Sequence, residues 1–432
     1  MSTDTTPASD TVWFKDVAVF DSRKGKLMSK SQVLVNDGLI ASVTRGDKAP
    51  AGSKGARVID GVGKTLMPGM IDAHYHTAFA TIPIAVATTA PAGYIHVMQG
   101  RDAEATLLRG FTTVRDAGGP SFGLKRAVDE GSAPGPRIFP SGAFISQSGG
   151  HGDFRMPYEV PRGICGCLSH IEIIGGSVLC DGVPEVLRGA REQLMGGATQ
   201  LKVMAGGGVA SSYDPIDVTQ FTFDEIRAAV ETAENFGTYV MVHAYTSRAV
   251  QQCLNAGVMC IDHGQLVDET TVELMARKDA WWSLQPFLHD ADMVPEPNPA
   301  NFQKALEVAA GTDRAYTMAR KHGIKVAWGT DTLFNAHLAT RQGEQVAKMV
   351  RWYTPSEVLK MVTFDNAQLL EMCGPRNPYA DAPLGVVEKG AHADLLLIDG
   401  NPVKNIDLIA DGESSMTVIM KGGTVFQDLT GG

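Results

Sequence analysis

The sequence predicts an α/β protein in which a (β/α)8 barrel carries a small β-sandwich domain built from both ends of the chain. Eight short apolar runs alternate with helical patterns through the middle of the 432 residues, whereas both ends are rich in strand and turn signals. Polar side chains lie in, or just past, the carboxyl ends of five of the eight runs. A barrel gathers the carboxyl ends of its strands at one mouth, whereas a doubly wound sheet, the alternative fold, would spread these side chains along an edge.

Short strand-like runs at the two ends of the chain predict the small β domain. They span residues 12–20, 32–35, 39–43, 393–398, 416–420 and 424–426. The tripeptide Asn36-Asp37-Gly38 between two of these runs is a strong hairpin signal. We expect residues 1–64 and 376–432 to form this domain, because the entropic cost of closing the long loop between them grows only slowly with its length.

The runs expected to form the barrel lie within residues 65–375, and several are apolar on both faces, as buried parallel strands are. They span residues 65–73, 112–116, 137–144, 200–204, 239–243, 258–262, 281–285 and 325–328. Helical patterns follow most of them, and the clearest, residues 224–236, begins with a capping box of Thr222 and Glu225. Residues 146–179 break the alternation with a Gly-rich stretch, which predicts a lid or substrate loop, or alternatively a disordered insert.

Charge and composition exclude several classes of protein. The net charge of −10 argues against a nucleic-acid or anionic-membrane partner, and no apolar stretch approaches the roughly 18 residues that span a bilayer. Six cysteines without a Cys-x-x-Cys pair predict reduced thiols, with a metal site at Cys165 and Cys167 as the alternative. Residues 1–10 are polar and lack a signal peptide's apolar core. We therefore expect a disordered tail and a cytoplasmic protein, or an exported one whose signal peptide has been removed.

Histidines close the first barrel run, and further polar residues close four others. His74 and His76 would project from one side of a strand, where two neutral imidazoles can hold a divalent metal. The other candidates are Lys202, His243, His263 and Asp331, each at or just past a strand end. Each has an ordinary explanation when it is taken singly, such as a structural histidine or a helix cap. Together, at one barrel mouth, they predict a metal site.

Lys202 needs a separate explanation, because an ammonium group at this mouth would repel cations. Burial and nearby positive charge lower the pKa of a lysine, and a neutral amine can add CO2 to form a carbamate that bridges two metals. Four histidines, this carbamate and Asp331 would hold two divalent ions, with Zn2+ favoured by the mixed ligands. Two such ions activate a water and polarise a carbonyl. Asp331 would be the catalytic base and then the acid for the leaving amine.

These residues resemble the amidohydrolase superfamily over nearly the whole chain. The matching motifs occupy residues 68–76, 202–208, 242–245, 262–264 and 329–331. They are most similar to the branch of imidazolonepropionase-like proteins, Xaa-Pro and Xaa-Arg/Lys dipeptidases, and ochratoxin-hydrolysing amidases. The resemblance implies one metal at His74, His76 and Asp331, a second at His243 and His263, and a carboxylated Lys202 that bridges both.

The same branch implies a substrate, because its dipeptidases cleave an amide beside a free α-carboxylate. We therefore expect a small amide or dipeptide that releases a C-terminal amino acid, with ochratoxin A among the candidates. The carboxylate needs cationic or hydroxyl partners, for which the sequence offers His151, Tyr245 and Arg248. Related amidases assemble as octamers, which implies a homo-oligomer here.

Two other functions are possible from the sequence. The first is a one-metal deaminase or cyclic-amide hydrolase, but superfamily deaminases carry a His-x-x-Glu-type acid, and Ala244, Tyr245 and Thr246 follow His243 here. The presence of Lys202 also disfavours deamination. The second is a metal-free scaffold, which the six intact ligand positions disfavour.

Overall fold

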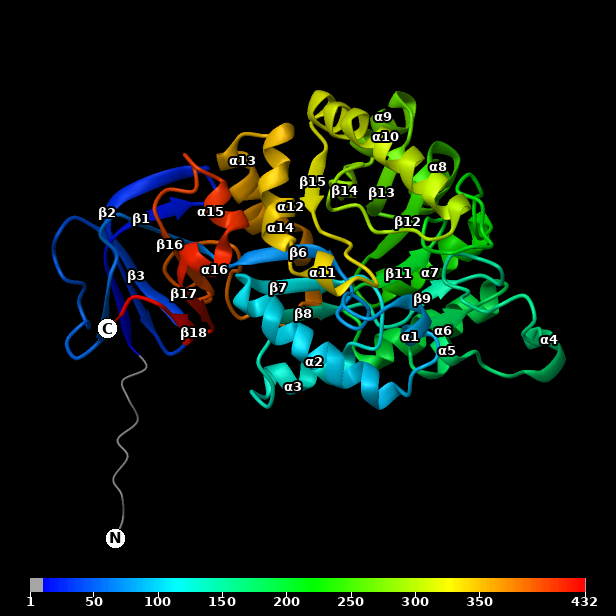
Figure 1. Ribbon diagram of the computed structural model, residues 1–432, viewed down its shortest axis with the longest axis horizontal. Coiled ribbons are helices and arrows are strands. Elements are labelled where there is room, and N and C mark those ends of the chain that lie inside the picture. Colours follow the sequence, from blue (N-terminus) through cyan, green and yellow to red (C-terminus); the bar gives the residue numbers. More distant parts are fainter. Residues whose placement is uncertain (1–10, 432) are drawn as a thin grey trace, which may run out of the picture.

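The computed structural model of the protein describes residues 11–431. Figure 1 shows a sheet made from both chain ends beside a larger α/β body. The tail predicted for residues 1–10 lies outside the described residues. Between residues 11 and 431, no helix combines the length and the apolar character that crossing a membrane requires.

Strands from both ends of the chain form one sheet in the order β18-β17-β16-β5-β1-β2-β3, with β4 paired to β1. They are β1 (Val12–Asp21), β2 (Lys26–Asn36), β3 (Leu39–Arg45), β4 (Arg57–Asp60), β5 (Lys64–Pro68), β16 (Leu395–Asp399), β17 (Met416–Lys421) and β18 (Thr424–Asp428). The chain turns between β2 and β3 at Asp37 and Gly38, whose φ angles are 49° and 77°. Two positive φ angles are typical of a type I′ hairpin turn. Val33 and Leu397 belong to the buried core of this sheet.

The first predicted barrel run, residues 65–73, is two strands rather than one. β5 pairs with β1 and β16 in the terminal sheet, whereas β6 (Met70–Tyr75) pairs with β7 (Phe111–Asp116). The break falls at Gly69, where a Cβ atom would lie 2.0 Å from Thr112 Oγ1. Glycine therefore lets the chain pass close to β7 as it leaves one sheet for the other.

The other strands form two sheets, β6-β7-β8 and β10-β9-β11-β12-β13-β14-β15, in which every pairing is parallel. They are β8 (Arg137–Pro140), β9 (Phe144–Ser146), β10 (Ser177–Leu179), β11 (Leu201–Met204), β12 (Val240–Thr246), β13 (Cys260–Leu266), β14 (Trp281–Leu284) and β15 (Lys325–Trp328). No strand ladder joins the two sheets within the described residues, so closure into a barrel stays a prediction. Asn366 bridges two of their edges, because its Nδ2 donates to Ile71 O of β6 and Trp328 O of β15 at 2.7 and 2.8 Å.

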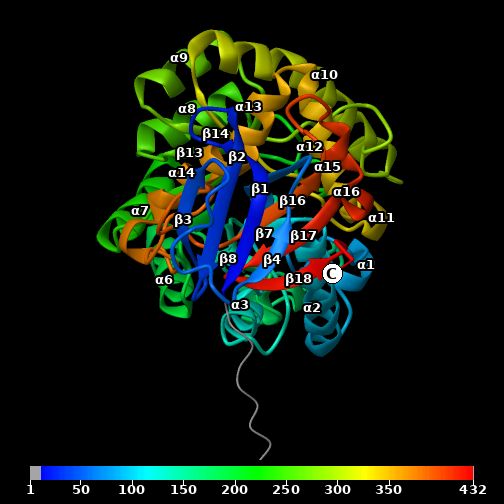
Figure 2. The same ribbon diagram turned by 90° about the vertical axis from the view of Figure 1, so that its left-hand side faces the viewer.

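Helices surround the parallel strands, as Figures 1 and 2 show. The longer ones are α2 (Ala92–Leu108), α3 (Phe122–Asp129), α6 (Val183–Gly196), α7 (Phe223–Asn235), α8 (Ser247–Ala256), α9 (Glu269–Arg277), α10 (Pro299–His322), α12 (Gln342–Lys348) and α13 (Pro355–Lys360). The shorter ones are α1 (Ile84–Ala87), α4 (Arg162–Cys165), α5 (His170–Ile173), α11 (Ala336–Ala339), α14 (Asn366–Leu370), α15 (Asp407–Ala410) and α16 (Gly412–Ser415). The capping box of Thr222 and Glu225 begins α7 as predicted. A π-helical turn, Met361–Asp365, separates α13 from α14.

The Gly-rich stretch of residues 146–179 contains the short elements α4, α5 and β10. Glu172 organises its second half, because its carboxylate caps α5 through Ser169 and pairs with Arg162 at 3.1 Å. The stretch also supplies His151 and Phe154 to the pocket described below, whereas Tyr158 is 86% exposed. Its role as a lid stays a prediction.

Candidate metal centre and substrate pocket

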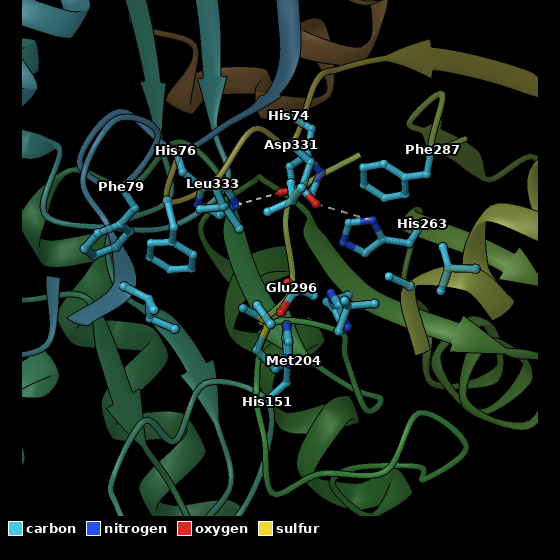
Figure 3. A pocket seen from close by; sticks show the side chains of 18 of the residues that line it. His74, His76, Phe79, His151, Met204, His263, Phe287, Glu296, Asp331 and Leu333 are labelled. Carbon is cyan, nitrogen blue, oxygen red and sulfur yellow. Dashed lines mark ion pairs between the residues drawn. The ribbon is translucent and has the colours of Figure 1, made fainter. Parts of the chain in front are cut away.

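A pocket at the carboxyl ends of the parallel strands is lined by all six candidate metal ligands. β6 ends beside His74 and His76, β11 carries Lys202, and Asp331 follows β15. The remaining two, His243 and His263, lie on β12 and β13. Figure 3 shows His74, Asp331 and His263 directed toward the same space.

His74, His76 and Asp331 form a compact group of potential metal ligands. Asp331 Oδ1 lies 3.3 Å from Nε2 of both histidines, and ligand atoms of all three residues lie within 4.8 Å of one another. The backbone sets this arrangement, because Asp331 N–H donates to His74 O at 2.8 Å and Asp331 has a φ angle of 50°. A non-glycine residue in the left-handed region is strained, and such strain clusters at functional sites.

Neighbouring oxygen atoms fix which ring nitrogen of three histidines carries the proton. Gly118 O accepts from His76 Nδ1 at 2.9 Å and Gly207 O accepts from His243 Nε2 at 3.1 Å. Gln285 Oε1 accepts from His263 Nδ1 at 2.7 Å. The opposite ring nitrogens, Nε2 of His76 and His263 and Nδ1 of His243, are thereby left as lone-pair donors. Partners of this kind orient the imidazole ligands of metal sites.

The electrostatics of the site favour neutral imidazoles at His243 and His263, whereas burial lowers the pKa of His74 but Asp331 and Asp262 outweigh it and raise that pKa. Burial lowers the pKa of His263 to about 3, and burial together with the neighbouring His151 and His263 lowers the pKa of His243 well below its usual range. Burial opposes ionisation of Asp331, but His74 and His76 outweigh it and hold the pKa of Asp331 well below its usual range. The forms of His243, His263 and Asp331 therefore fit a divalent metal, since ligands must be deprotonated to bind one.

Lys202 is buried and donates to Asp262 Oδ2 at 2.7 Å. Arg115, a fully buried residue of β7, donates to the other oxygen, Oδ1, also at 2.7 Å. Burial opposes ionisation of Asp262, but these two cations hold its pKa well below its usual range. The sequence interpretation assigned no role to Arg115 or Asp262, although each is a charged residue inside an apolar strand, the same signal that identified Lys202.

The structure places the three predicted substrate residues differently. His151 lines the pocket and its ring stacks on His243, with centroids 4.1 Å apart. Tyr245 lines it as well, and its ring stacks on His263 at 5.1 Å. Arg248 is exposed on the first turn of α8 and does not line the pocket. The sequence places Arg248 near His243, but the direction of the helix turns its side chain to solvent.

Apolar side chains form most of the remaining pocket wall. They include Phe79, Ile84, Phe144, Phe154, Ile171, Met204, Phe287, Leu288, Met293, Val294, Val308, Leu333 and Phe334. Two acids also line it. Asp292 is paired with Arg341 and Lys348, whereas Glu296 has no ion pair within the described part of the chain. The sequence interpretation did not identify this wall, because its residues come from loops far apart in the chain.

Comparison with known proteins gives consistent matches across the chain. A family described as the amidohydrolase family matches residues 65–425. The ochratoxinase of Aspergillus niger is 29% identical over 428 residues, which cover 93% of this chain and 84% of that protein. The crystal structure of an amidohydrolase superposes with a TM-score of 0.86 at 36% identity, covering 97% of this chain and 99% of that one. A prolidase crystallised with N-methylphosphonate-L-proline also superposes with a TM-score of 0.86, at 35% identity, covering 97% of this chain and 100% of that one.

Proposed function

The chain belongs to the amidohydrolase family and is a hydrolase of C–N bonds, and we propose that it uses two divalent metals to cleave an amide or peptide bond and release a C-terminal amino acid. The observation that carries this proposal is the single pocket lined by His74, His76, Lys202, His243, His263 and Asp331. Strands far apart in the sequence supply these residues, and chance would seldom gather such a set.

The inferred architecture is an eight-stranded barrel with a β-sandwich domain made from both chain ends. The eight strands are β6, β7, β8 with β9 as one bent strand, β11, β12, β13, β14 and β15. Asn366 supports closure on one side by joining β6 to β15. On the other side, Gln200 Nε2 donates to Phe139 O of β8 at 3.0 Å, next to the start of β11. The predicted limits give residues 65–375 to the barrel, but β5 belongs to the terminal sheet, so we place the start of the barrel at Met70 and keep residue 375 as its end.

The family pattern implies which residues of this chain would bind each metal ion. His74, His76 and Asp331 would hold one ion, His243 and His263 the other, and carboxylated Lys202 would bridge them. Zn2+ suits these nitrogen and oxygen donors. When bound, the ions supply an activated water and polarise the scissile carbonyl.

Asp331 is the residue best placed to move the proton. Its carboxylate is ionised at neutral pH because of the neighbouring histidines, and its side chain is 12% exposed at the pocket surface. It can therefore accept a proton from the attacking water and deliver it to the leaving amine. His151 and Tyr245 would contact the substrate carboxylate, and the apolar wall would receive its apolar groups.

A screen of N-acyl amino acids and dipeptides with varied C-terminal residues, including ochratoxin A, tests the proposal. We expect metal-dependent release of the C-terminal amino acid from at least one substrate class. Ammonia release from cyclic amidines without amide cleavage would favour the one-metal deaminase, and no metal and no turnover would favour the scaffold. Assembly as a homo-oligomer, with an octamer as the analogy, is also part of the proposal and can be measured by light scattering.

A further inference from the structure

A buried hydrogen-bonded chain lies behind His151, outside the set of metal ligands. His151 Nδ1 lies 2.6 Å from Ser211 Oγ, and Ser211 Oγ in turn hydrogen-bonds to Asp214 Oδ1. The other carboxylate oxygen, Oδ2, lies 3.4 Å from the same ring nitrogen. The exposed fractions of the three residues are only 8%, 7% and 3%. Ser211 and Asp214 come from the loop after β11, whereas His151 belongs to the long Gly-rich stretch.

The chemistry of these three side chains determines which group donates in each hydrogen bond. An ionised carboxylate can only accept, so the Ser211 hydroxyl must donate to Asp214. The Ser211 oxygen is then free to accept, and the proton between Ser211 and His151 must belong to Nδ1. Burial opposes ionisation of Asp214, but its hydrogen bond with His151 outweighs burial and lowers its pKa. His151 thus carries a proton on Nδ1, and Nε2 is the ring nitrogen left for a ligand.

The two loops that carry the chain are held together by further polar contacts. Gln220 joins them, because its Oε1 accepts from His151 N at 2.9 Å and its Nε2 donates to Asp214 Oδ2 at 3.3 Å. Lys304 of α10 donates to the carbonyl oxygens of Gly208, Ser211 and Asp214 at 3.1, 2.7 and 2.9 Å. Because one ammonium group donates to three carbonyl oxygens of the same loop, it holds that loop in a single conformation.

The His151 ring is also closely packed by His243 and Gly208. One face stacks on His243, with centroids 4.1 Å apart and the planes 21° apart. A Cβ atom added to Gly208 would lie 2.0 Å from His151 Cε1, so glycine is needed for the ring to occupy this place. A ring packed this closely and bonded at Nδ1 has one orientation available.

We propose that Ser211 and Asp214 are positioning residues that hold His151 with Nδ1 protonated and Nε2 presented to the substrate. This inference rests on the proposed function only in that His151 contacts substrate there. The arrangement parallels the way a carboxylate fixes the tautomer and orientation of a catalytic imidazole. Among residues 11–431, neither residue forms a hydrogen bond or ion pair with any of the six candidate ligands.

Nitrogen NMR of 15N-histidine-labelled protein tests the positioning without using activity. We expect the His151 signal to report a proton on Nδ1 in the wild type and in Ser211→Thr, which keeps the hydroxyl. Asp214→Asn should lose this fixed tautomer, and Ser211→Ala should weaken it, because Asp214 Oδ2 at 3.4 Å remains as an acceptor for Nδ1. Ser212→Ala alters an exposed neighbour on the same loop and should leave the spectrum unchanged. An unchanged His151 signal in Asp214→Asn would overturn the proposal.

Kinetics on the metal-loaded protein then separate positioning from folding. In Asp214→Asn and Ser211→Ala we expect kcat/KM to fall by about tenfold or more, with metal content and melting temperature near wild type. Ser211→Thr should restore most of kcat/KM. Wild-type kcat/KM in Ser211→Ala, or equal losses in Thr and Ala variants, would overturn the proposal. If the tautomer responds as expected but no amide is cleaved by any variant or the wild type, the proposed function fails while the positioning stands.

Discussion

Lys202 Nζ lies 2.7 Å from Asp262 Oδ2, and neither side chain reaches solvent. Arg115 binds the second oxygen of the same carboxylate. Asp262 would therefore keep a cationic partner if Lys202 became a neutral amine and then a carbamate. A buried carboxylate with its charge still paired is far less costly than an isolated one, so this geometry is compatible with modification of Lys202.

We expect Lys202→Ala to fold, because Arg115 still pairs with Asp262, but to lose most bound metal and activity. The reason is the loss of the proposed bridge between the two ions. Metal analysis of the purified variant measures the loss of bound metal. Labelling the wild type with 13C-bicarbonate detects the carbamate on Lys202. Lys278→Ala, which removes an exposed lysine, is the control. Two equivalents of metal and full activity in Lys202→Ala would refute the bridging role.

Asp331→Asn should keep much of the bound metal but lose turnover by about a hundredfold or more, the contribution of a general base. An amide oxygen can still coordinate an ion weakly, yet it cannot accept a proton from water. Steady-state kcat and metal content on the same sample distinguish the two effects. A variant with near wild-type kcat would exclude Asp331 as the proton carrier.

Phe154 brings an aromatic ring from the long Gly-rich stretch into the pocket, where it packs against Phe144 with centroids 6.0 Å apart. Phe154→Ala should raise KM for N-acyl phenylalanine about tenfold, because burying an aromatic group is worth about 1.5–3 kcal/mol. The KM for N-acyl alanine should change less. Tyr158→Ala on the same stretch removes a side chain that is 86% exposed and should change neither. Equal effects on both substrates would show that Phe154 does not contribute to the preference for phenylalanine over alanine.

Asp292 ties the loop after β14 to α12 through Lys348 and Arg341. Burial opposes its ionisation, but the hydrogen bonds from these two cations outweigh it and lower its pKa. A carboxyl group with a lowered folded-state pKa stabilises the protein above its unfolded pKa, and this contribution disappears as the pH falls through the folded-state pKa.

Asp292→Asn should therefore cost about 2 kcal/mol of unfolding free energy at pH 7, and the difference from wild type should shrink as the pH falls below about 4. Urea unfolding at a series of pH values measures this. Glu130→Gln breaks an exposed pair with Arg126 and should change stability by less than about 1 kcal/mol. A wild-type-to-variant difference that stays constant from pH 7 to pH 3 would contradict this account.

The sequence predicted the parts of the fold that follow from local periodicity. Apolar runs identified the parallel strands, and the Asp37-Gly38 turn and the capping box at Thr222 lie where predicted. The change of sheet at Gly69 was not predicted, because an apolar run does not show which sheet each half joins. The backbone approach of Gly69 to Thr112 that causes the break exists only in the folded protein.

The candidate site was predictable where a charged or imidazole side chain lies in, or just past the end of, an apolar strand. His74, His76, Lys202, His243, His263 and Asp331 all met this criterion, and all line the pocket. Their roles stay predictions. Partners such as Arg115 for Asp262 depend on which strands are neighbours, and the apolar wall depends on loop conformations, so the sequence could not show them. Arg248 shows the limit of proximity along the chain, because one helical turn directs it to solvent.

The central claim is that this pocket holds two metal ions that are needed for amide hydrolysis. The most direct measurement is to remove metal with a chelator, add Zn2+ back in steps, and follow bound metal and amino-acid release together. We predict loss of activity in the metal-free protein and recovery that is complete near two equivalents per chain, with His74→Ala failing to recover. Full activity in the metal-free protein, or full recovery at one equivalent, would contradict the account.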